Sequence, residues 1–317
     1  MKIIYYGTPE FAVPSLNSLV EHGYDVVAVV TAPDKPAGRG QQLTFSAVKE
    51  YALSKGLKVL QPEKLKAQSF LEEVKSLEAD LQIVVAFRMM PEVLWSMPPL
   101  GTFNLHGSLL PQYRGAAPIN RAVMNGEIKT GLTTFFLQQE IDTGSIILRE
   151  EVSIGENESA GELHDRMMQI GAGLVLKTVQ QIEQGGIKAM PQEMFFKSSE
   201  ELKHAPKIFK EDCKLDFSKT ISAIHNHIRG LSPYPGAFVE FQKTDNSIFA
   251  MKIYKSTKEE AGVFLTHQLV TDGKTFLKIS GADGFVNVIE AQLPGKKRMP
   301  IGDLLRGFHF EDDWKII

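Results

Sequence analysis

The sequence predicts an α/β protein in which a mostly parallel, Rossmann-like sheet domain is followed by a small, OB-like β-barrel domain. Over residues 2–87, short apolar runs alternate with helical segments, which is typical of a parallel sheet that helices cover on both faces. Beyond residue 206 the pattern changes to short strands separated by glycines and turns, which is typical of a small barrel. The length of 317 residues suits two domains, each able to bury a core.

The first domain begins with a strand, a turn and a helix. Residues 2–6 are mostly β-branched or aromatic, the run ends at Gly7, and Pro9 suits the first turn of a helix. The turn lacks the G-x-G-x-x-G pattern of dinucleotide sites and the chain has no P-loop, so a nicotinamide oxidoreductase is a weak alternative. The apolar pattern then predicts strands over 25–30, 57–60, 81–87 and 102–106, and helices over 46–54 and 69–77.

Two further strands and a long helix complete the first domain. Residues 129–138 and 145–154 are rich in Thr, Ile, Leu, Val and Phe, which predicts a strand on each side of a loop. Apolar residues then recur at helical spacing, at Leu163, Met167, Ile170 and Leu174. This spacing predicts an amphipathic helix over 159–184, which the glycines at 185 and 186 end.

The second domain is expected to hold one helix and several short strands. A helix over 222–229 leads to the turn-rich break at 232–236. The strands are expected over 237–241, 249–254, 276–280 and 285–291. These changes of pattern set the domain bounds: a first domain over 1–187, a linker over 188–205 and a barrel domain over 206–317.

The composition fits a protein of the cytoplasm. Cys213 is the only cysteine, so neither an intrachain disulfide nor a cysteine-rich metal site is possible. The first apolar run is too short for a signal peptide, and no later run approaches the length of a membrane span. We expect a cytoplasmic protein without a membrane segment, and we take it to be a monomer.

The net charge of −3 is unevenly distributed along the chain. Before Lys203 there are 18 Lys and Arg against 24 Asp and Glu, which gives −6, and from Lys203 onward there are 17 against 14, which gives +3. A mildly basic second part is compatible with contact to nucleic acid but does not require it.

The sequence His225-Asn226-His227 suggests a metal site at first sight. Helical residues at i and i+2 do not share a face, so the two imidazoles would not converge on one ion. We therefore expect surface histidines at this place and no bound metal.

Three side chains near the end of the strand over 102–106 can carry proton-transfer chemistry. Residues i and i+2 of a strand point to the same face, so Asn104 and His106 project side by side. Asp142, on a loop before Thr143 and Gly144, could reach the imidazole and fix its tautomer or raise its basicity. Taken singly, a hydrogen-bonded structural histidine and a simple turn remain open as alternatives.

The combination of motifs is far more specific. Asn104, His106, the run 108–111, the segment 114–118 and the loop 142–144, in this order and spacing, resemble the folate-dependent formyltransferases. The likeness covers nearly the whole chain and is greatest to the branch that acts in translation initiation. It implies an enzyme that transfers the formyl group of 10-formyltetrahydrofolate to the amino group of methionine on initiator methionyl-tRNA, with Asn104, His106 and Asp142 as its catalytic residues.

The resemblance also implies where the folate is bound. Family members line this site with the segment that corresponds to Ser108, Leu109, Leu110 and Pro111. A second family loop lies near the pterin and corresponds here to Phe87, Arg88 and Met89. Arg88 stands where many members have Gly, which is a departure from the family pattern.

Two basic segments match family elements that contact tRNA. The loop 34–40 carries Lys35 and Arg39, with a glycine on either side of Arg39, and a flexible basic tip of this kind can approach phosphates or base edges. The segment 295–299 supplies Lys296, Lys297 and Arg298 for backbone phosphates.

Other functions remain as alternatives. A formyltransferase for a small amine, or a formyltetrahydrofolate hydrolase with water as acceptor, would use the same Asn, His and Asp. A noncatalytic RNA-binding module that keeps the fold is an alternative of a different class.

Overall fold

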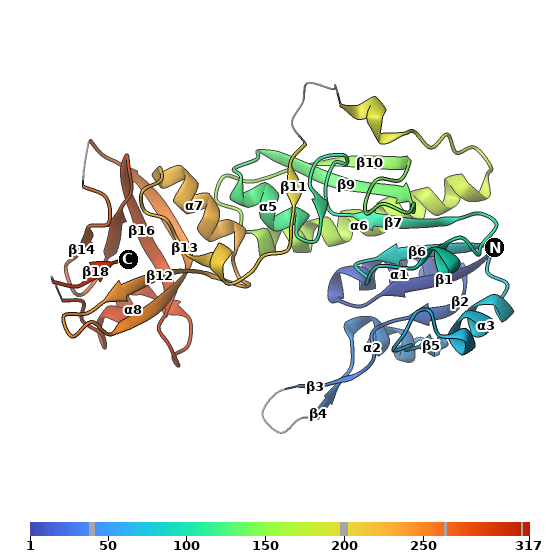
Figure 1. The fold of residues 1–317 in the computed structure, drawn as a ribbon, viewed down its shortest axis with the longest axis horizontal. Helices are drawn as coiled ribbons and strands as arrows, with labels where there is room; N and C mark the ends of the chain where they lie inside the picture. Colours follow the sequence, from blue (N-terminus) through green and yellow to red (C-terminus); the bar gives the residue numbers. More distant parts are fainter. Residues whose placement is uncertain (38–41, 197–201, 263–264, 312) are drawn as a thin grey trace. The chain divides into compact units, whose positions relative to one another are not determined.

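The computed structural model describes residues 1–37, 42–196, 202–262, 265–311 and 313–317. These residues form two compact units (Figure 1). The N-terminal unit comprises Met1–Pro118, Thr130–Val152 and His164–His204. The C-terminal unit comprises Ile119–Lys129, Ser153–Leu163 and Ala205–Ile317.

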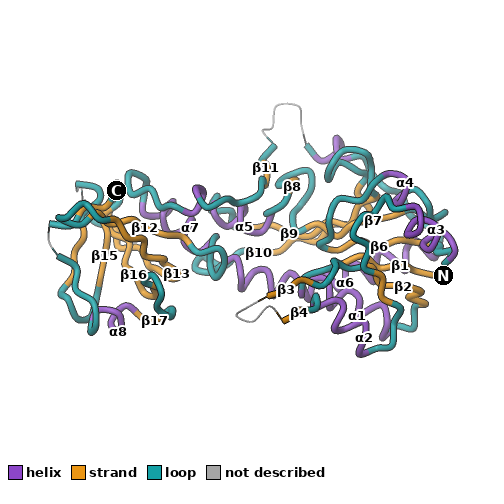
Figure 2. The backbone as a smooth tube through the Cα atoms, turned by 60° about the horizontal axis from the view of Figure 1, so that its bottom comes forward, coloured by secondary structure: helices purple, strands orange, loops and turns teal. Residues whose placement is uncertain are grey.

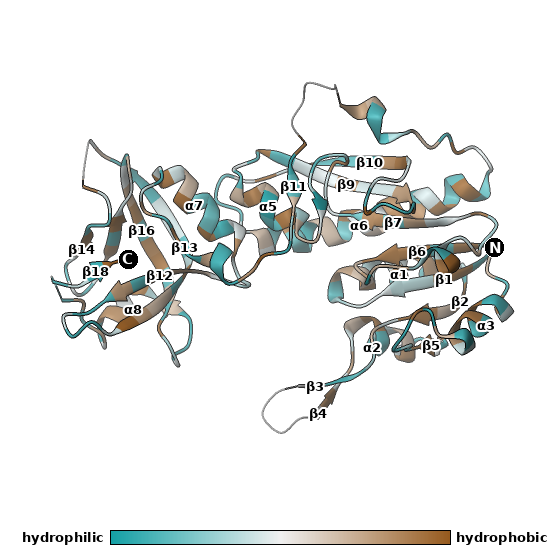
Figure 3. Cartoon of the chain, in the orientation of Figure 1, coloured by the Kyte–Doolittle hydropathy of each residue, from teal (hydrophilic) through white to brown (hydrophobic). Residues whose placement is uncertain are grey.

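A seven-stranded sheet forms the centre of the N-terminal unit. Its strand order is β10-β9-β7-β6-β1-β2-β5, and the strands β5, β2, β1, β6 and β7 run parallel, whereas β9 is antiparallel to β7. The bounds are β1 Lys2–Gly7, β2 Asp25–Val30, β5 Val59–Leu60, β6 Leu81–Val85, β7 Thr102–His106, β9 Lys129–Phe136 and β10 Ile146–Ser153. The apolar character of these strands is visible as brown colour on β1 and β6 (Figure 3). Continuous apolar strands of this kind are expected where both faces of a sheet are covered.

Helices cover both faces of this sheet (Figure 2). On one face, Ile4, Tyr6 and Val84 pack with residues of α3 and α4. On the other face lie α1, α2 and α6, and the side chain of Leu105 in β7 contacts α6. The bounds are α1 Val13–Glu21, α2 Ala47–Ser54, α3 Gln68–Ser76, α4 Glu92–Trp95, α5 Pro118–Met124 and α6 Ala160–Glu183.

Capping residues fix the beginnings of two of these helices. The Ser46 hydroxyl accepts a hydrogen bond from the Lys49 N–H at 3.1 Å at the start of α2. At the start of α6, the Ser159 hydroxyl accepts from the Glu162 N–H at 3.2 Å, and the Glu162 carboxylate accepts from the Ser159 N–H at 2.8 Å. This reciprocal pair is a capping box, which satisfies main-chain donors that a helix leaves unpaired.

The C-terminal unit is built on an antiparallel, barrel-like sheet. Its strand order is β14-β15-β16-β13-β12-β18, and β17 pairs with β16. The helix α7 (Ile221–Gly230) packs with this sheet in one apolar core that includes Ile224, Phe241 and Val286. The bounds are β12 Ala237–Gln242, β13 Ile248–Glu260, β14 Leu269–Thr271, β15 Leu277–Ser280, β16 Gly284–Gln292, β17 Met299–Pro300, α8 Ile301–Leu305 and β18 Lys315–Ile316.

Two earlier segments of the chain complete the C-terminal unit. In residues 119–129, the Asn120 side chain donates to the Gly230 main-chain oxygen at 2.8 Å. In residues 153–163, the Glu158 main-chain oxygen accepts from the Arg229 guanidinium at 2.9 Å. These contacts join α7 to chain that precedes it by more than 60 residues.

The predicted fold class is confirmed. The predicted strands and helices of the sheet domain occur within a few residues of their expected bounds, although the strand expected to reach residue 87 ends at Val85. The strand expected over 249–254 is longer and covers Ile248–Glu260. Within the described part of the chain, no helix is both long and apolar enough to cross a membrane.

Candidate active site

The strand β7 places Asn104 and His106 on one face of the first sheet. Leu105, between them, points to α6, because a Cβ added at Gly171 of that helix would lie 2.8 Å from a methyl carbon of Leu105. Side chains alternate along a strand, so Asn104 and His106 point to the opposite face. Among the described residues, the amide of Asn104 makes no side-chain hydrogen bond, which leaves its N–H groups able to donate to a ligand.

The His106 ring is held by the main chain. Its Nε2 lies 2.8 Å from the Tyr113 carbonyl oxygen, and the residue is 6% exposed. A carbonyl oxygen can only accept, so Nε2 must carry a proton. The ring also meets Phe135 edge-on, with 6.5 Å between the ring centroids. In the neutral imidazole, Nδ1 is therefore the nitrogen with the free lone pair.

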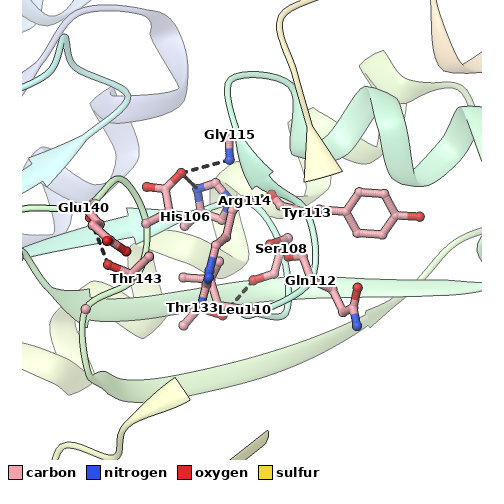
Figure 4. A network of polar contacts seen from close by, with 12 residues as sticks. His106, Ser108, Leu110, Gln112, Tyr113, Arg114, Gly115, Thr133, Glu140 and Thr143 are labelled. Atoms are coloured by element: carbon pink, nitrogen blue, oxygen red, sulfur yellow. Dashed lines mark hydrogen bonds and ion pairs between the residues drawn. The ribbon is translucent and has the colours of Figure 1, made fainter. Parts of the chain in front are cut away.

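The Asp142 carboxylate lies between a main-chain N–H and the His106 ring. Its Oδ2 accepts from the Gly115 N–H at 2.9 Å and lies 3.8 Å from His106 Nδ1, and Figure 4 marks both contacts with dashed lines. Gly115 has a backbone φ of 124°, a conformation that residues other than glycine rarely adopt. The structure therefore brings His106 and Asp142 together, as the sequence predicted, with Asn104 on the same face of β7.

The turn at residues 108–112, which follows β7, is held by hydrogen bonds to itself and to β9. The Ser108 hydroxyl donates to the Gln112 main-chain oxygen at 2.6 Å, and the Thr133 hydroxyl donates to the Ser108 main-chain oxygen at 2.6 Å. The Leu110 N–H donates to the Thr133 hydroxyl at 3.1 Å (Figure 4). These bonds tie the chain after His106 to β9.

The four residues predicted to line the folate site differ in exposure. Ser108 and Leu110 are fully buried, and Pro111 is also buried. Leu110 belongs to a small apolar cluster with Phe135 and Ile146. Of the four, Leu109 is the one with a partly exposed side chain.

The second predicted folate segment, 87–89, follows β6. Phe87 is half-buried and meets the Tyr6 ring edge-on at 5.6 Å. Arg88 is exposed, and its guanidinium donates to the main-chain oxygens of Pro62 and Glu63, at 2.8 Å for Glu63. Met89 is 74% exposed. Arg88 is thus tied to a neighbouring loop, while Met89 is open to solvent.

The first predicted tRNA segment lies on a two-stranded hairpin. The strands are β3 (Lys35–Ala37) and β4 (Gln42–Thr44), and Lys35 is exposed. At its base, hydrogen bonds from Lys49 and Gln61 hold the pKa of Asp34 below its ordinary value. Arg39 lies outside the described residues.

The second predicted tRNA segment forms an exposed turn between β16 and β17. Lys296, Lys297 and Arg298 are all exposed. The Arg298 guanidinium donates to the Glu290 carboxylate and lies 4.7 Å from the centre of the Tyr254 ring. The charge of Arg298 is therefore partly balanced by Glu290.

One of the two histidines of α7, His225, does not lie where the sequence predicted. His225 is 3% exposed and its Nδ1 lies 3.0 Å from the Ser256 hydroxyl, so the expectation of a surface residue was wrong. His227 Nε2 lies 2.8 Å from the Asp212 main-chain oxygen. The two rings contact different parts of the unit, His225 at β13 and His227 at Asp212, and short sequence patterns do not reveal such contacts. Among the described residues, no group of three His, Cys, Asp or Glu side chains could hold a metal ion.

Sequence reasoning missed the main-chain groups of the site. The Tyr113 carbonyl and the Gly115 N–H hold His106 and Asp142, but neither depends on the identity of a side chain. The glycine at 115, beside Arg114, was the only available signal, since an unusual backbone conformation often requires glycine.

The sequence matches two family models. Residues 1–179 match the family described as formyl transferase, and residues 207–309 match the formyl transferase C-terminal domain. The methionyl-tRNA formyltransferase of Bacteroides fragilis is 51% identical over 317 residues, covering 100% of this chain and 98% of that protein. The protein of the same name from Parabacteroides distasonis is 54% identical over 310 residues, covering 97% of this chain and 96% of the relative.

Solved structures share the fold. An N-formyltransferase from Helicobacter canadensis, in complex with folinic acid and dTDP-3-aminofucose, has a TM-score of 0.67 at 24% identity and covers 91% of this chain and 98% of its own. HypX from Aquifex aeolicus, in complex with tetrahydrofolic acid, has a TM-score of 0.63 at 17% identity and covers 99% of this chain and 50% of its own.

Proposed function

This chain belongs to the formyl transferase family, and we propose that it transfers the formyl group of 10-formyltetrahydrofolate to the amino group of methionine on initiator methionyl-tRNA. The observation that carries this proposal is the identity of 51% over all 317 residues with a protein named methionyl-tRNA formyltransferase. The contact between His106 and Asp142 supports it, because transfer to an amine requires a proton acceptor at the site.

We propose that His106 moves the proton and that Asp142 stabilises the charged ring. As the amine nitrogen bonds to the formyl carbon, the amine loses a proton, which His106 Nδ1 can accept because Nε2 already carries one. The imidazolium then faces the Asp142 carboxylate, 3.8 Å away. When the bond between the formyl carbon and the folate nitrogen breaks, the imidazolium returns the proton to that nitrogen, so the ring ends in its starting state.

Asn104 serves the oxygen of the formyl group in this mechanism. That oxygen becomes an anion when the amine attacks, and a fixed amide donor is worth about 3 kcal/mol in the transition state of such a reaction. The Asn104 amide has no competing hydrogen bond among the described residues, and it shares a face of β7 with His106. The donor and the proton carrier can therefore act on the same reacting carbon.

For the folate we propose contacts from the two segments that the resemblance indicated. The side chains of Leu109 and Met89 are accessible to a ligand, and in this proposal the Phe87 ring would lie next to the pterin ring. The buried Ser108, Leu110 and Pro111 would shape the site through their main chain. Arg88 would lie at the edge of the folate site, since its guanidinium donates hydrogen bonds to the main chain at residues 62–63.

For the tRNA we propose contacts from both units. Lys35 and Arg39 would approach the acceptor stem, and Lys296, Lys297 and Arg298 would contact backbone phosphates. In this proposal residues 1–187 carry catalysis, 188–205 join the parts, and 206–317 bind tRNA. We further propose that the protein acts as a monomer in the cytoplasm, where translation begins.

The decisive experiment is a formylation assay with the full chain. The protein is mixed with 10-formyltetrahydrofolate and initiator tRNA charged with methionine, and the released amino acid is tested for formylmethionine. Parallel reactions contain uncharged tRNA, a free amino sugar nucleotide, or no acceptor. Formylmethionine on the charged tRNA supports the proposal.

Each other result identifies an alternative. Formate released without an acceptor indicates a hydrolase, and formylation of the small amine alone indicates a different acceptor. Binding of charged tRNA on a gel, with no turnover and no folate binding by calorimetry, indicates a noncatalytic RNA-binding module.

A further inference from the structure

We propose that Gln192 is a positioning residue that holds the Asp142 loop in the geometry that the reaction needs. The proposal rests on the proposed function for its catalytic consequence. Gln192 begins the short 3-10 helix η2 (Gln192–Phe195), in the segment that the sequence indicated as a linker. Its side chain is 0% exposed, so it cannot touch a substrate and must act through its neighbours.

Both the nitrogen and the oxygen of the Gln192 side-chain amide make hydrogen bonds. Its Nε2 donates to the main-chain oxygens of Asp142, at 2.8 Å, and Gly144, at 2.9 Å. Its Oε1 accepts from the Arg114 Nε at 3.0 Å and from an Arg114 terminal nitrogen at 2.6 Å. Each donor and acceptor of a buried amide is costly to leave unpaired, so this side chain strongly specifies the positions of four atoms on its three partner residues.

These partners belong to the two segments that hold the catalytic carboxylate. One segment is the loop that carries Asp142 itself, and the other runs through Arg114 to Gly115, whose N–H donates to Asp142 Oδ2 at 2.9 Å. One amide group therefore joins the backbone beneath the carboxylate to the chain that binds its oxygen. The distance of 3.8 Å between Asp142 Oδ2 and His106 Nδ1 depends on both segments.

The loop needs such support because of its backbone conformation. Asp142 has φ 55°, in the left-handed region, which costs a residue with a side chain about 1–2 kcal/mol. Conformations of this kind persist where surrounding contacts determine them. The two bonds from Gln192 lie on either side of Thr143 and fix the loop at this place.

Gln192 is itself positioned by contacts that do not involve its amide. Met190 and Ile146 exchange two main-chain hydrogen bonds of 2.8 Å on one side of it. On the other side, Phe195 packs on the apolar cluster of Leu110, Phe135 and Ile146. Loss of the amide alone should therefore leave the segment in place and release only the Asp142 loop.

The test compares Gln192→Met with the wild type and with Glu193→Gln as the matched control. Methionine keeps the length and fills the buried space, while Glu193 is an exposed neighbour on the same turn. We expect kcat to fall about 10- to 100-fold in Gln192→Met, since small misplacements of catalytic groups have effects of this size. The KM values for tRNA and folate should stay within about twofold, and Glu193→Gln should resemble the wild type.

A second readout separates positioning from a general loss of structure. Amide hydrogen exchange at Gly115 reports directly on its bond to Asp142 and requires no turnover. We expect this exchange to rise about tenfold or more in Gln192→Met, while amides of β1 keep their wild-type rates. A structural role alone would change amides throughout the sheet together.

The outcomes decide between the two proposals. Wild-type kcat or wild-type Gly115 exchange in Gln192→Met would overturn the role of Gln192. If the wild type itself does not formylate methionyl-tRNA, the proposed function fails, and the Gly115 exchange still decides whether Gln192 holds the loop. If the methionine variant does not fold, Gln192→Glu replaces it in both measurements. Glutamate keeps an oxygen that accepts from Arg114 but lacks the N–H groups that donate to the main-chain oxygens of Asp142 and Gly144.

Discussion

The two ring nitrogens of His106 meet chemically different neighbours. Nε2 donates to the Tyr113 carbonyl, which cannot titrate, whereas Nδ1 faces the Asp142 carboxylate. The ring is therefore locked in orientation through one nitrogen and available for proton transfer through the other. This arrangement gives His106 one direction for proton exchange, which a histidine on a surface would not have.

We expect Asp142→Asn to lower kcat by about 10²- to 10⁴-fold, the range over which general acid–base groups contribute. An asparagine oxygen can still accept from the Gly115 N–H, so the loop should keep its place while the negative charge facing His106 is lost. Turnover is measured at saturating concentrations of both substrates, with the fold checked by circular dichroism. Glu140→Gln, an exposed change on the same loop, is the control, and near-wild-type turnover in Asp142→Asn would contradict the mechanism.

His225 should make the C-terminal unit sensitive to acid. Burial lowers the pKa of His225 to about 4, and the nearby charges of Arg229 and Lys258 act in the same direction. An unfolded histidine has a pKa of about 6.5, so between pH 6.5 and 4 the unfolded chain binds more protons. The stability contribution is complete above about pH 6.5 and is lost as the pH falls, by roughly 3 kcal/mol at most.

The measurement is urea unfolding from pH 7 to 4 in a Trp95→Phe background. The chain has two tryptophans, so Trp314 then reports on the C-terminal unit alone. His225→Gln, which does not titrate, should show a flatter dependence of the unfolding free energy on pH over this window. Equal slopes for the two proteins would refute the assignment.

The main elements could be predicted from the sequence, because each depends on a local pattern, whereas the approach of Asp142 to His106 was expected from the family resemblance. The strand β7 is an apolar run that ends at a glycine, and its period of two places Asn104 with His106. The hairpin of β3 and β4 was expected only as a loop, since its strands are three residues each and carry no alternation. The main-chain groups at Tyr113 and Gly115 could not be predicted, because they depend on how distant segments pack.

The turn after β9 should tolerate no side chain at Gly144. A Cβ there would lie 1.6 Å from the Phe136 main-chain oxygen, at the end of β9. We expect Gly144→Ala to lower the free energy of unfolding by about 1–3 kcal/mol and to lower kcat, because relief of the clash would move Asp142. Urea unfolding and the formylation assay measure the two effects.

Gly173→Ala is the matched control. Gly173 is exposed in α6, where an added Cβ meets no atom within 4 Å, so alanine should stabilise the helix by about 0.5–1 kcal/mol. Similar stability for the two variants would show that the turn can rearrange around a side chain.

At the scale of the whole molecule, charge is divided along the chain. The part before Lys203 carries −6 and the part from Lys203 onward carries +3, and exposed lysines stand at the turn between β16 and β17. A polyanion would be attracted to the second part and held less by the first. This division agrees with a proposed role of the C-terminal unit in binding tRNA.

The affinity for methionyl-tRNA should fall as salt rises, because phosphate contacts release counterions. We expect Lys297→Ala to reduce the slope of log affinity against log salt by about 1, the effect of losing one phosphate contact. Lys315→Ala, a change of equal charge at an exposed residue of β18, should leave the slope unchanged. Affinity that does not depend on salt would refute the proposed phosphate contacts.

The C-terminal unit draws on three separate stretches of the chain, and this limits how such a gene can recombine. A crossover near codon 205 would transfer the barrel without residues 119–129 and 153–163, which pack with it. The incoming barrel would have to accept the corresponding stretches of a foreign parent beside Arg229 and Gly230. Productive chimaeras therefore require parents that match at those two stretches.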